Sequence, residues 1–248
     1  MKNVLKGMAV ALGAALLMPA TTKAQDEFTV SGKADFVSNY VWRGSDQNSG
    51  FSIQPNLALS YKGVTLAAWG SQSLTNASEA PQEFDINLSY STKGFTVMVS
   101  DYWWNGMAAP YGRYKDGHHF EGTLSYNFSE SCNLPLTLSW STWFAGADDN
   151  RVKDNGELDR AFSTYIFASY DIALPADITL TPAVGFTPWE GVYHNKAAFT
   201  DISLKATKAI EVTDRFSIPL FVQAIVAPHD TGKGVDKTYL VAGFSLGF

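Results

Sequence analysis

Five charged residues stand at alternating positions in apolar or aromatic runs, where their side chains could meet inside a fold. The stretch NYVWRG closes an aromatic run with Arg43. Four carboxylates hold comparable positions further along the chain, namely Glu83, Asp85, Glu121 and Asp201. A guanidinium group facing carboxylates can form a charged constriction, a clamp for a solute or a structural network of ion pairs. The sequence leaves these three alternatives open, and the five residues are its candidate binding site.

Residues for other chemistry are present without the spacing that such chemistry needs. The G-x-S-x-G motif of many hydrolases does not occur in the sequence. His119 and Glu121 share a parity, but no nucleophile can be named beside them, so we expect no catalytic residue. The acidic segment 148–157 lacks the D-x-[DN]-x-[DN]-G spacing of a calcium loop. We therefore expect neither a metal site nor a cofactor.

Period-2 alternation predicts the elements that must position the charged residues. In EFDINLSY, residues 83–90, polar and apolar residues alternate as they do along a half-buried β-strand. No segment shows a convincing helical period, and no linker or repeat divides the chain, so we predict a single all-β domain. Twelve segments carry the strand pattern: 28–43, 51–61, 63–74, 82–92, 94–104, 118–128, 133–145, 160–173, 176–187, 197–208, 214–226 and 238–248.

The connections between these segments alternate in length. Short turns such as 61–64 and 91–94 follow every second strand, whereas the other connections are longer and polar: 44–50, 75–81, 105–117, 146–159, 188–196 and 227–237. This layout is typical of a transmembrane antiparallel up-and-down β-barrel with periplasmic turns and extracellular loops. A soluble sandwich has no physical reason to sort its loops by length.

The two ends of the chain predict its location. Lys2 and Lys6 precede an apolar run over residues 7–18, and small residues precede Gln25, which predicts a signal peptide over 1–24 and a barrel over 25–248. The final strand ends in Phe248, which resembles the terminal signal read by the outer-membrane assembly machinery. Without residues 1–24 the chain has 15 basic and 24 acidic residues, a net charge of −9 that argues against a nucleic-acid partner.

Aromatic residues gather at the predicted strand ends, where they would meet the lipid headgroups of the outer membrane. One set falls at the long-loop end: Trp42, Trp103, Trp104, Trp143, Phe144 and Trp189. A second set falls at the short-turn end: Tyr61, Tyr90, Phe95, Phe128, Tyr170, Phe216 and Phe248. Trp69, Trp143 and Phe221 are also candidates for inward aromatics that would partly plug the lumen. Parity along the first segment points Arg43 inward, together with Lys33 and Asp35.

The segment ADFVSNYVWRG, residues 34–44, resembles the N-terminal motif D-x-x-S-x-Y-V-x-R-G of the Gcw-chp family of bacterial outer-membrane proteins. The resemblance implies a barrel of about this length in the outer membrane. Arg43 matches the arginine of the motif, but the resemblance assigns no binding or catalytic residue.

These features predict a bacterial outer-membrane barrel that acts as a small-solute channel or transporter, with a charged constriction near the extracellular mouth. The alternative is a closed barrel that is structural or binds a ligand through its surface loops. An outer-membrane hydrolase is the third interpretation, and we expect that the protein is not an enzyme. A channel requires an open water path through the lumen, which a structural barrel would fill with its own side chains.

Overall fold

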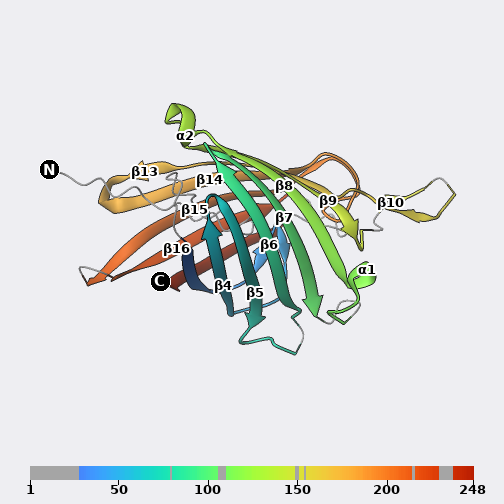
Figure 1. Ribbon diagram of the computed structural model, residues 1–248, viewed down its shortest axis with the longest axis horizontal. Helices are drawn as coiled ribbons and strands as arrows, with labels where there is room; N and C mark the ends of the chain where they lie inside the picture. Colours follow the sequence, from blue (N-terminus) through green and yellow to red (C-terminus); the bar gives the residue numbers. More distant parts are fainter. Residues whose placement is uncertain are drawn as a thin grey trace.

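The protein is a closed antiparallel β-barrel, described here from a computed structural model (Figure 1). The structure describes residues 28–78, 80–105, 110–148, 151–153, 155–213, 216–228 and 237–248. The predicted signal peptide lies outside these residues and stays a prediction. Within them, no helix is long and apolar enough to cross a membrane.

Twelve strand positions form the barrel in the described part of the chain. Each strand pairs antiparallel with its sequence neighbours, and β1 pairs with β17, while β12 and β13 together occupy one position against β14. The bounds are β1 Thr29–Val37, β4 Ser52–Tyr61, β5 Val64–Ser73, β6 Gln82–Thr92, β7 Phe95–Asn105, β8 His118–Asn127, β9 Leu136–Gly146, β12 Thr164–Tyr170, β13 Ile172–Leu174, β14 Ile178–Thr187, β15 Ala198–Thr213, β16 Phe216–Ala227 and β17 Lys237–Gly247.

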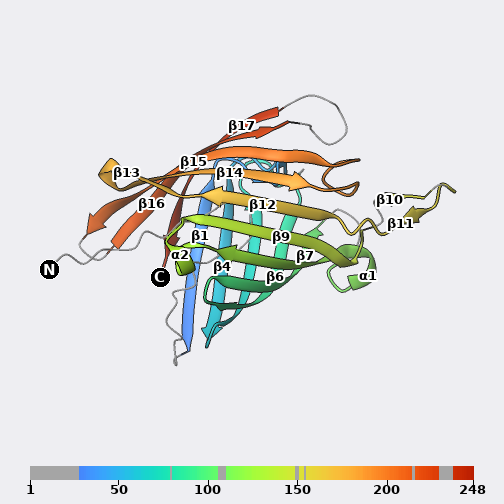
Figure 2. The ribbon, with the colours of Figure 1, turned by 90° about the horizontal axis from the view of Figure 1, so that it is seen from above.

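Short elements lie at the two ends of the barrel. Helix α2 (Ser129–Cys132) and the 3₁₀ turn η1 (Pro175–Asp177) belong to the end with short connections. Helix α1 (Tyr114–Gly117) and the hairpin of β10 (Arg151–Val152) and β11 (Leu158–Asp159) belong to the opposite end. Figures 1 and 2 show this hairpin projecting away from the barrel. The prediction that short and long connections sort to opposite ends is confirmed.

Two of the short connections are tight turns that the sequence encodes locally. Lys62 and Gly63 have φ of 48° and 85°, and Lys93 and Gly94 have φ of 47° and 86°. Positive φ at both central residues defines a type I′ turn, whose twist matches that of the flanking strands. Each Lys-Gly pair therefore fixes the register of its hairpin.

The outer surface of the barrel is apolar and the lumen is polar. Large apolar side chains stand exposed at outward positions: Leu57, Leu66, Leu88, Val97, Val99, Leu124, Leu204 and Val222. Small polar side chains are buried at the alternating positions: Ser52, Gln54, Asn56, Asn87, Ser100, Ser125, Ser139 and Gln223. A continuous exposed apolar surface suits lipid, because lipid tails offer no hydrogen bonds. The predicted transmembrane fold with about twelve strands is confirmed.

Two predicted strands are interrupted in the structure, and the predicted strand 197–208 runs further, to Thr213. The segment 28–43 does not run as one strand: β1 ends at Val37, and the chain then folds into a separate hairpin of β2 (Val41–Trp42) and β3 (Ser45–Asp46). The segment 160–173 is divided as well, because Asp171 separates β12 from β13. In both segments the alternation of polar and apolar residues continues past the point where the chain leaves the sheet, so the predicted strand was too long.

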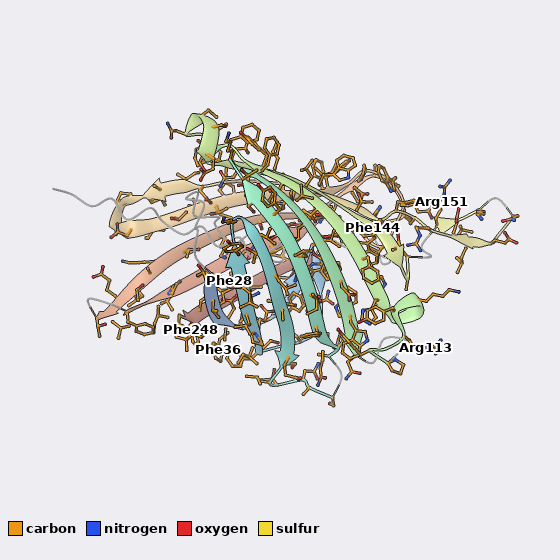
Figure 3. The ribbon with its side chains drawn as sticks, in the orientation of Figure 1. Phe28, Phe36, Arg113, Phe144, Arg151 and Phe248 are labelled. Carbon is orange, nitrogen blue, oxygen red and sulfur yellow. The ribbon has the colours of Figure 1, made fainter. Side chains whose placement is uncertain are left out.

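The prediction for the aromatic end belts is partly wrong. Trp189 is exposed, as expected for the long-loop end. So are Phe144 at that end and Phe248 at the other end (Figure 3). In contrast, Trp104 and Trp143 are buried in the lumen, and Trp42 packs against them. Phe221 is buried too, which agrees with its expected inward direction.

Candidate functional site

A hairpin folds back into the lumen from the end of β1. We call residues 38–50 the inner hairpin; β2 and β3 are its two arms. Its turn is formed by Arg43 and Gly44, with φ of 50° and 82°. This is again the signature of a type I′ turn, so the Arg-Gly pair is the tip of a hairpin. Arg43 therefore points inward from the hairpin tip, and not from a barrel strand as the sequence suggested.

Contacts on both sides hold the inner hairpin in place. Within it, the Tyr40 amide donates to Ser49 Oγ over 2.9 Å, and the Gln47 amide donates to the Tyr40 carbonyl, also over 2.9 Å. Ser73 Oγ, at the end of β5, donates to the Ser49 carbonyl over 2.5 Å. At the tip, a Cβ on Gly44 would lie 2.2 Å from the Thr200 carbonyl oxygen of β15. The hairpin thus reaches from its root beside β5 to the wall at β15, and only glycine fits at this contact.

Arg43 forms a two-pronged ion pair with Glu121 of β8. Its Nη1 lies 2.6 Å from Glu121 Oε2, and its Nη2 lies 2.8 Å from Oε1. The side chains are 2% and 1% exposed. Tyr102 of β7 donates to Glu121 Oε1 over 2.9 Å. Parallel charge-assisted hydrogen bonds fix direction as well as distance, so the pair holds the hairpin tip against one point of the wall.

Aromatic rings surround the guanidinium group. Arg43 Cζ lies 4.7 Å from the ring centroid of Trp42, 4.5 Å from that of Tyr165 and 5.3 Å from that of Tyr193. Arg43 also donates to the Tyr193 hydroxyl. Tyr193 lies between β14 and β15, where burial raises the pKa of its hydroxyl and keeps it protonated. Desolvated cation–π contacts of this kind add to the stability of the ion pair.

A second ring cluster extends from Trp42 along the wall of the lumen. Trp42 packs with Tyr102, Trp104 and Trp143 at centroid distances of 5.9, 5.9 and 6.3 Å. Tyr193 also contacts Trp42, at 5.8 Å. These rings pack beside the Arg43–Glu121 pair and narrow the lumen at the height of the inner hairpin.

The other three candidate carboxylates line the lumen without pairing with Arg43. Asp201 accepts from the Tyr165 hydroxyl over 3.1 Å and from Thr200 Oγ1 over 2.8 Å. Glu83 is hydrogen-bonded by Tyr40 and Trp104. Neither carboxylate oxygen of Asp85 has a hydrogen-bond partner. The structure therefore brings all five sequence candidates into the lumen around the inner hairpin, and divides them into one ion pair and three separate carboxylates.

A second charged group lies nearer the short-turn end. Lys33 Nζ is 2.8 Å from Asp35 Oδ2, and Ser245 donates to Asp35 Oδ1 over 2.5 Å. Lys205 of β15 places its ammonium 4.5 Å from the centroid of Phe221. These residues lie on β1, β15, β16 and β17, away from the hairpin tip.

Sequence reasoning did not predict the cluster of aromatic rings around the Arg43–Glu121 pair, although Trp143 was among the candidate inward aromatics. On β7 the odd-numbered Val97 and Val99 are exposed to lipid. The even-numbered Tyr102 and Trp104 belong to the opposite face, so strict alternation along the strand predicts that both point inward. Trp143 shares its parity with the buried Ser141 in the same way. Tyr193 carried no such signal, because it belongs to a connection, where alternation has no meaning.

His118 and Asp148 of the acidic segment have structural partners, whereas the buried Nδ1 of His119 has no hydrogen-bond partner. His118 Nδ1 is 2.6 Å from Asp101 Oδ1, and its Nε2 is 2.5 Å from the Tyr111 carbonyl oxygen, so both ring nitrogens are engaged. Asp148 accepts from the amide and hydroxyl of Ser163 over 3.0 and 2.6 Å. Within the described residues, no group of three or more histidine, cysteine or acidic side chains could hold a metal ion; Asp149, Asn150, Asp154 and His229 lie outside them.

A closed twelve-stranded barrel with an apolar outer surface, a polar lumen and loops sorted by length defines the class: this is a bacterial outer-membrane β-barrel protein. The chain belongs to the family described as "Bacterial protein of unknown function (Gcw_chp)", whose model matches residues 21–237. The resemblance of the segment around Arg43 to this family is thereby confirmed.

Comparison with solved structures finds outer-membrane barrels. The chain is similar to a NanC porin, with a TM-score of 0.50 at 10% identity over 88% of this chain and 99% of that one. It is also similar to an outer-membrane channel from Pseudomonas putida F1, with a TM-score of 0.47 at 14% identity over 94% of this chain and 100% of that one. The comparison with curated proteins gives no match. At these identities the likeness to the NanC porin shows the barrel fold alone.

Proposed function

We propose that the protein is an outer-membrane channel for small solutes, and that the inner hairpin forms a charged constriction near its extracellular mouth. The candidate binding residues are those predicted from the sequence, with Arg43 at the hairpin tip and Glu83, Asp85, Glu121 and Asp201 on the wall around it. The observation that carries the proposal is the Arg43–Glu121 pair, which fastens the inner hairpin across an otherwise polar lumen.

The lumen wall supports a path for water and polar solutes. Inward positions on β4, β8 and β9 are filled by small polar side chains such as Gln54, Ser125 and Ser139. A barrel built only for structure gains more by filling its interior with apolar side chains, because each buried polar group needs a partner. The polar rows favour transport through the lumen, and the hairpin provides the point of control.

One observation favours the alternative of a closed structural barrel. Arg43 is 5% exposed and its neighbours Tyr102 and Trp143 are 1% and 2% exposed, so the rings pack closely around the pair. A lumen sealed at this height would pass no solute unless the hairpin moves. Conductance measurements separate the two functions.

The test measures single-channel conductance of the purified barrel in planar lipid bilayers. One variant replaces residues 41–46, the arms and tip of the inner hairpin, with two glycines. If the hairpin is the constriction, the shortened variant has a conductance several-fold above that of the wild type. A matched control shortens the β10–β11 hairpin, which projects away from the barrel (Figure 1), and leaves conductance unchanged.

Folding of each variant is verified by its circular dichroism and by its heat-dependent migration in gels. Folded barrels that do not conduct with or without the inner hairpin would establish the closed structural barrel in place of the channel. Equal conductance of the wild type and the shortened variant would place the constriction elsewhere.

A further inference from the structure

The wall formed by β6 and β7 carries buried polar groups that have no partner. Neither oxygen of the Asp85 carboxylate has a hydrogen bond, and neither does the amide of Asn87 or the hydroxyl of Ser100. The Trp103 backbone amide lies close to Asp85 without forming a well-aligned hydrogen bond. All three side chains are at most 2% exposed. Buried polar groups are almost always hydrogen-bonded, so a cluster of three without partners indicates an occupant.

The strand register places these groups together on the lumen face. Asn87 lies directly opposite Ser100 in the β6–β7 pair, and Asp85 is two residues before Asn87 on the same face. Directly opposite residues have Cβ atoms about 4.5–5.5 Å apart, and diagonal neighbours are within reach of longer side chains. On the other side, Asn87 faces the small Ala67 of β5, which leaves room beside the amide.

The surroundings of the cluster are negative. Arg43 forms its ion pair with Glu121, although its charge also acts on Glu83. Glu83 lies two residues before Asp85 on the same face and adds a second carboxylate. Lys33 lies on β1, separated from β6 by β4 and β5, and is bonded to Asp35. Charges of one sign in a low-dielectric site attract an ion of the opposite sign.

We propose that Asp85, Asn87 and Ser100 form a lumenal subsite for a small, singly charged cation, either a metal ion or the primary ammonium group of an organic solute. The inference deepens the proposed channel function and rests on it, because the subsite lies on the wall beside Glu121, which is opposite Ser100 in the register. It specifies the solute class as cationic.

The donor set matches this chemistry. The Asp85 carboxylate, the Asn87 carbonyl and the Ser100 hydroxyl offer hard oxygen ligands to a metal ion, and they accept equally well from the three N–H groups of an ammonium. Asp85 is the one carboxylate among these three ligands, which suits a singly charged cation, whereas tight divalent sites use more acidic ligands. Glu83 supplies charge from the neighbouring position and keeps its own bonds to Tyr40 and Trp104.

The subsite is tested by cation-dependent stability, which does not require conduction. A cation that binds the folded barrel raises its urea midpoint in a saturable way. The folded barrel in detergent is titrated with potassium chloride or ethylammonium chloride, with N-methylglucamine chloride keeping the ionic strength constant. We expect a saturable rise for the wild type, and a half-saturation concentration at least about tenfold higher for Asp85→Asn, since one hydrogen bond to a charged group is worth such a factor.

Asp35→Asn is the matched control, because it removes a lumenal carboxylate that already has Lys33 and Ser245 as partners. It should lower the midpoint and leave the cation response intact. A response to potassium alone identifies a metal-ion site, and a response to ethylammonium identifies an ammonium site; both support the proposal. An unsaturable response, or equal responses of the wild type and Asp85→Asn, would overturn it.

Conductance distinguishes failure of the subsite from failure of the channel. Reversal potentials under a potassium chloride gradient are measured for the same proteins in planar bilayers. A conducting wild type without a saturable cation response refutes the subsite and leaves the channel. A saturable response lost in Asp85→Asn, in a barrel that does not conduct, supports the subsite and refutes the channel.

Discussion

Replacing Arg43 with alanine should destabilise the barrel and open its lumen. The substitution removes both hydrogen bonds to Glu121 and leaves that carboxylate 0% exposed with one neutral donor from Tyr102 and a longer one from Thr123. Breaking a buried ion pair by deleting one partner costs about 3–5 kcal/mol, because the remaining charge stays desolvated. The three ring contacts of the guanidinium group are lost in addition.

The effect is measured as a shift of the urea midpoint of the folded barrel. With a denaturant slope of about 2 kcal/mol per molar, a loss of about 4 kcal/mol lowers the midpoint by about 2 M. The double variant Arg43→Ala with Glu121→Ala should lose less than the sum of the single variants, by about 2 kcal/mol, because it leaves no unpaired charge. Lys33→Ala is the control: the Lys33 side chain is 29% exposed and Asp35 keeps its hydrogen bond from Ser245, so this removal should cost less than that of Arg43.

Conductance of the same variant reports the role of the pair in transport. Freed from Glu121, the hairpin tip no longer holds its place against the wall, and one positive charge leaves the lumen. We expect higher conductance and a stronger preference for cations over anions. A wild-type midpoint together with wild-type conductance and selectivity would refute the reasoning, since the pair would then fasten nothing. A lower midpoint with unchanged conductance would make Arg43 a structural residue only.

Three further substitutions probe the fold around this site. Gly44→Ala should lower the urea midpoint by more than Gly156→Ala, because both residues have φ near +82° but only Gly44 has an atom, the Thr200 carbonyl oxygen, within reach of the new Cβ; equal effects would mean that the hairpin tip does not contact β15. Leu88→Arg should cost about 2–4 kcal/mol in lipid, and Ser89→Arg far less, because only Leu88 faces the membrane; equal losses would contradict the assigned faces. Deleting Phe248, whose amide donates to the Gly32 carbonyl over 2.9 Å, should reduce the yield of folded barrel in cells, and a normal yield would count against its role as an assembly signal.

The sequence predicted the barrel because lipid and water impose a strict alternation on each strand. Leu88 and Asp85 differ in parity, so Leu88 faces the lipid and Asp85 faces the lumen. A shift of one residue along a strand moves the side chain from one face to the other. The Lys-Gly turns at Lys62 and Lys93 are equally local, since positive φ selects glycine at the second position of each turn. The inward direction of Glu83, Asp85, Glu121 and Asp201 followed from the same period-2 rule.

The sequence could not predict what fills the lumen. Alternation continues through Tyr40 and Trp42, so nothing local separated the inner hairpin from the strand before it. The partners of Arg43 come from β8, β12 and the connection that carries Tyr193, up to 150 positions away in the chain. Which carboxylate it meets depends on barrel closure and on the height of each strand.

The sequence by itself therefore determined the location of the chain in the membrane, the barrel and the face to which each strand residue belongs, because these follow from solvent contrast and local backbone geometry. Only the tertiary structure decided that Arg43 pairs with Glu121, that Asp201 is held by Tyr165 and that Asp85 remains without a partner. The physical reason is that hydrogen bonds and ion pairs act over a few ångströms, and residues far apart in sequence come within that range only when the barrel closes.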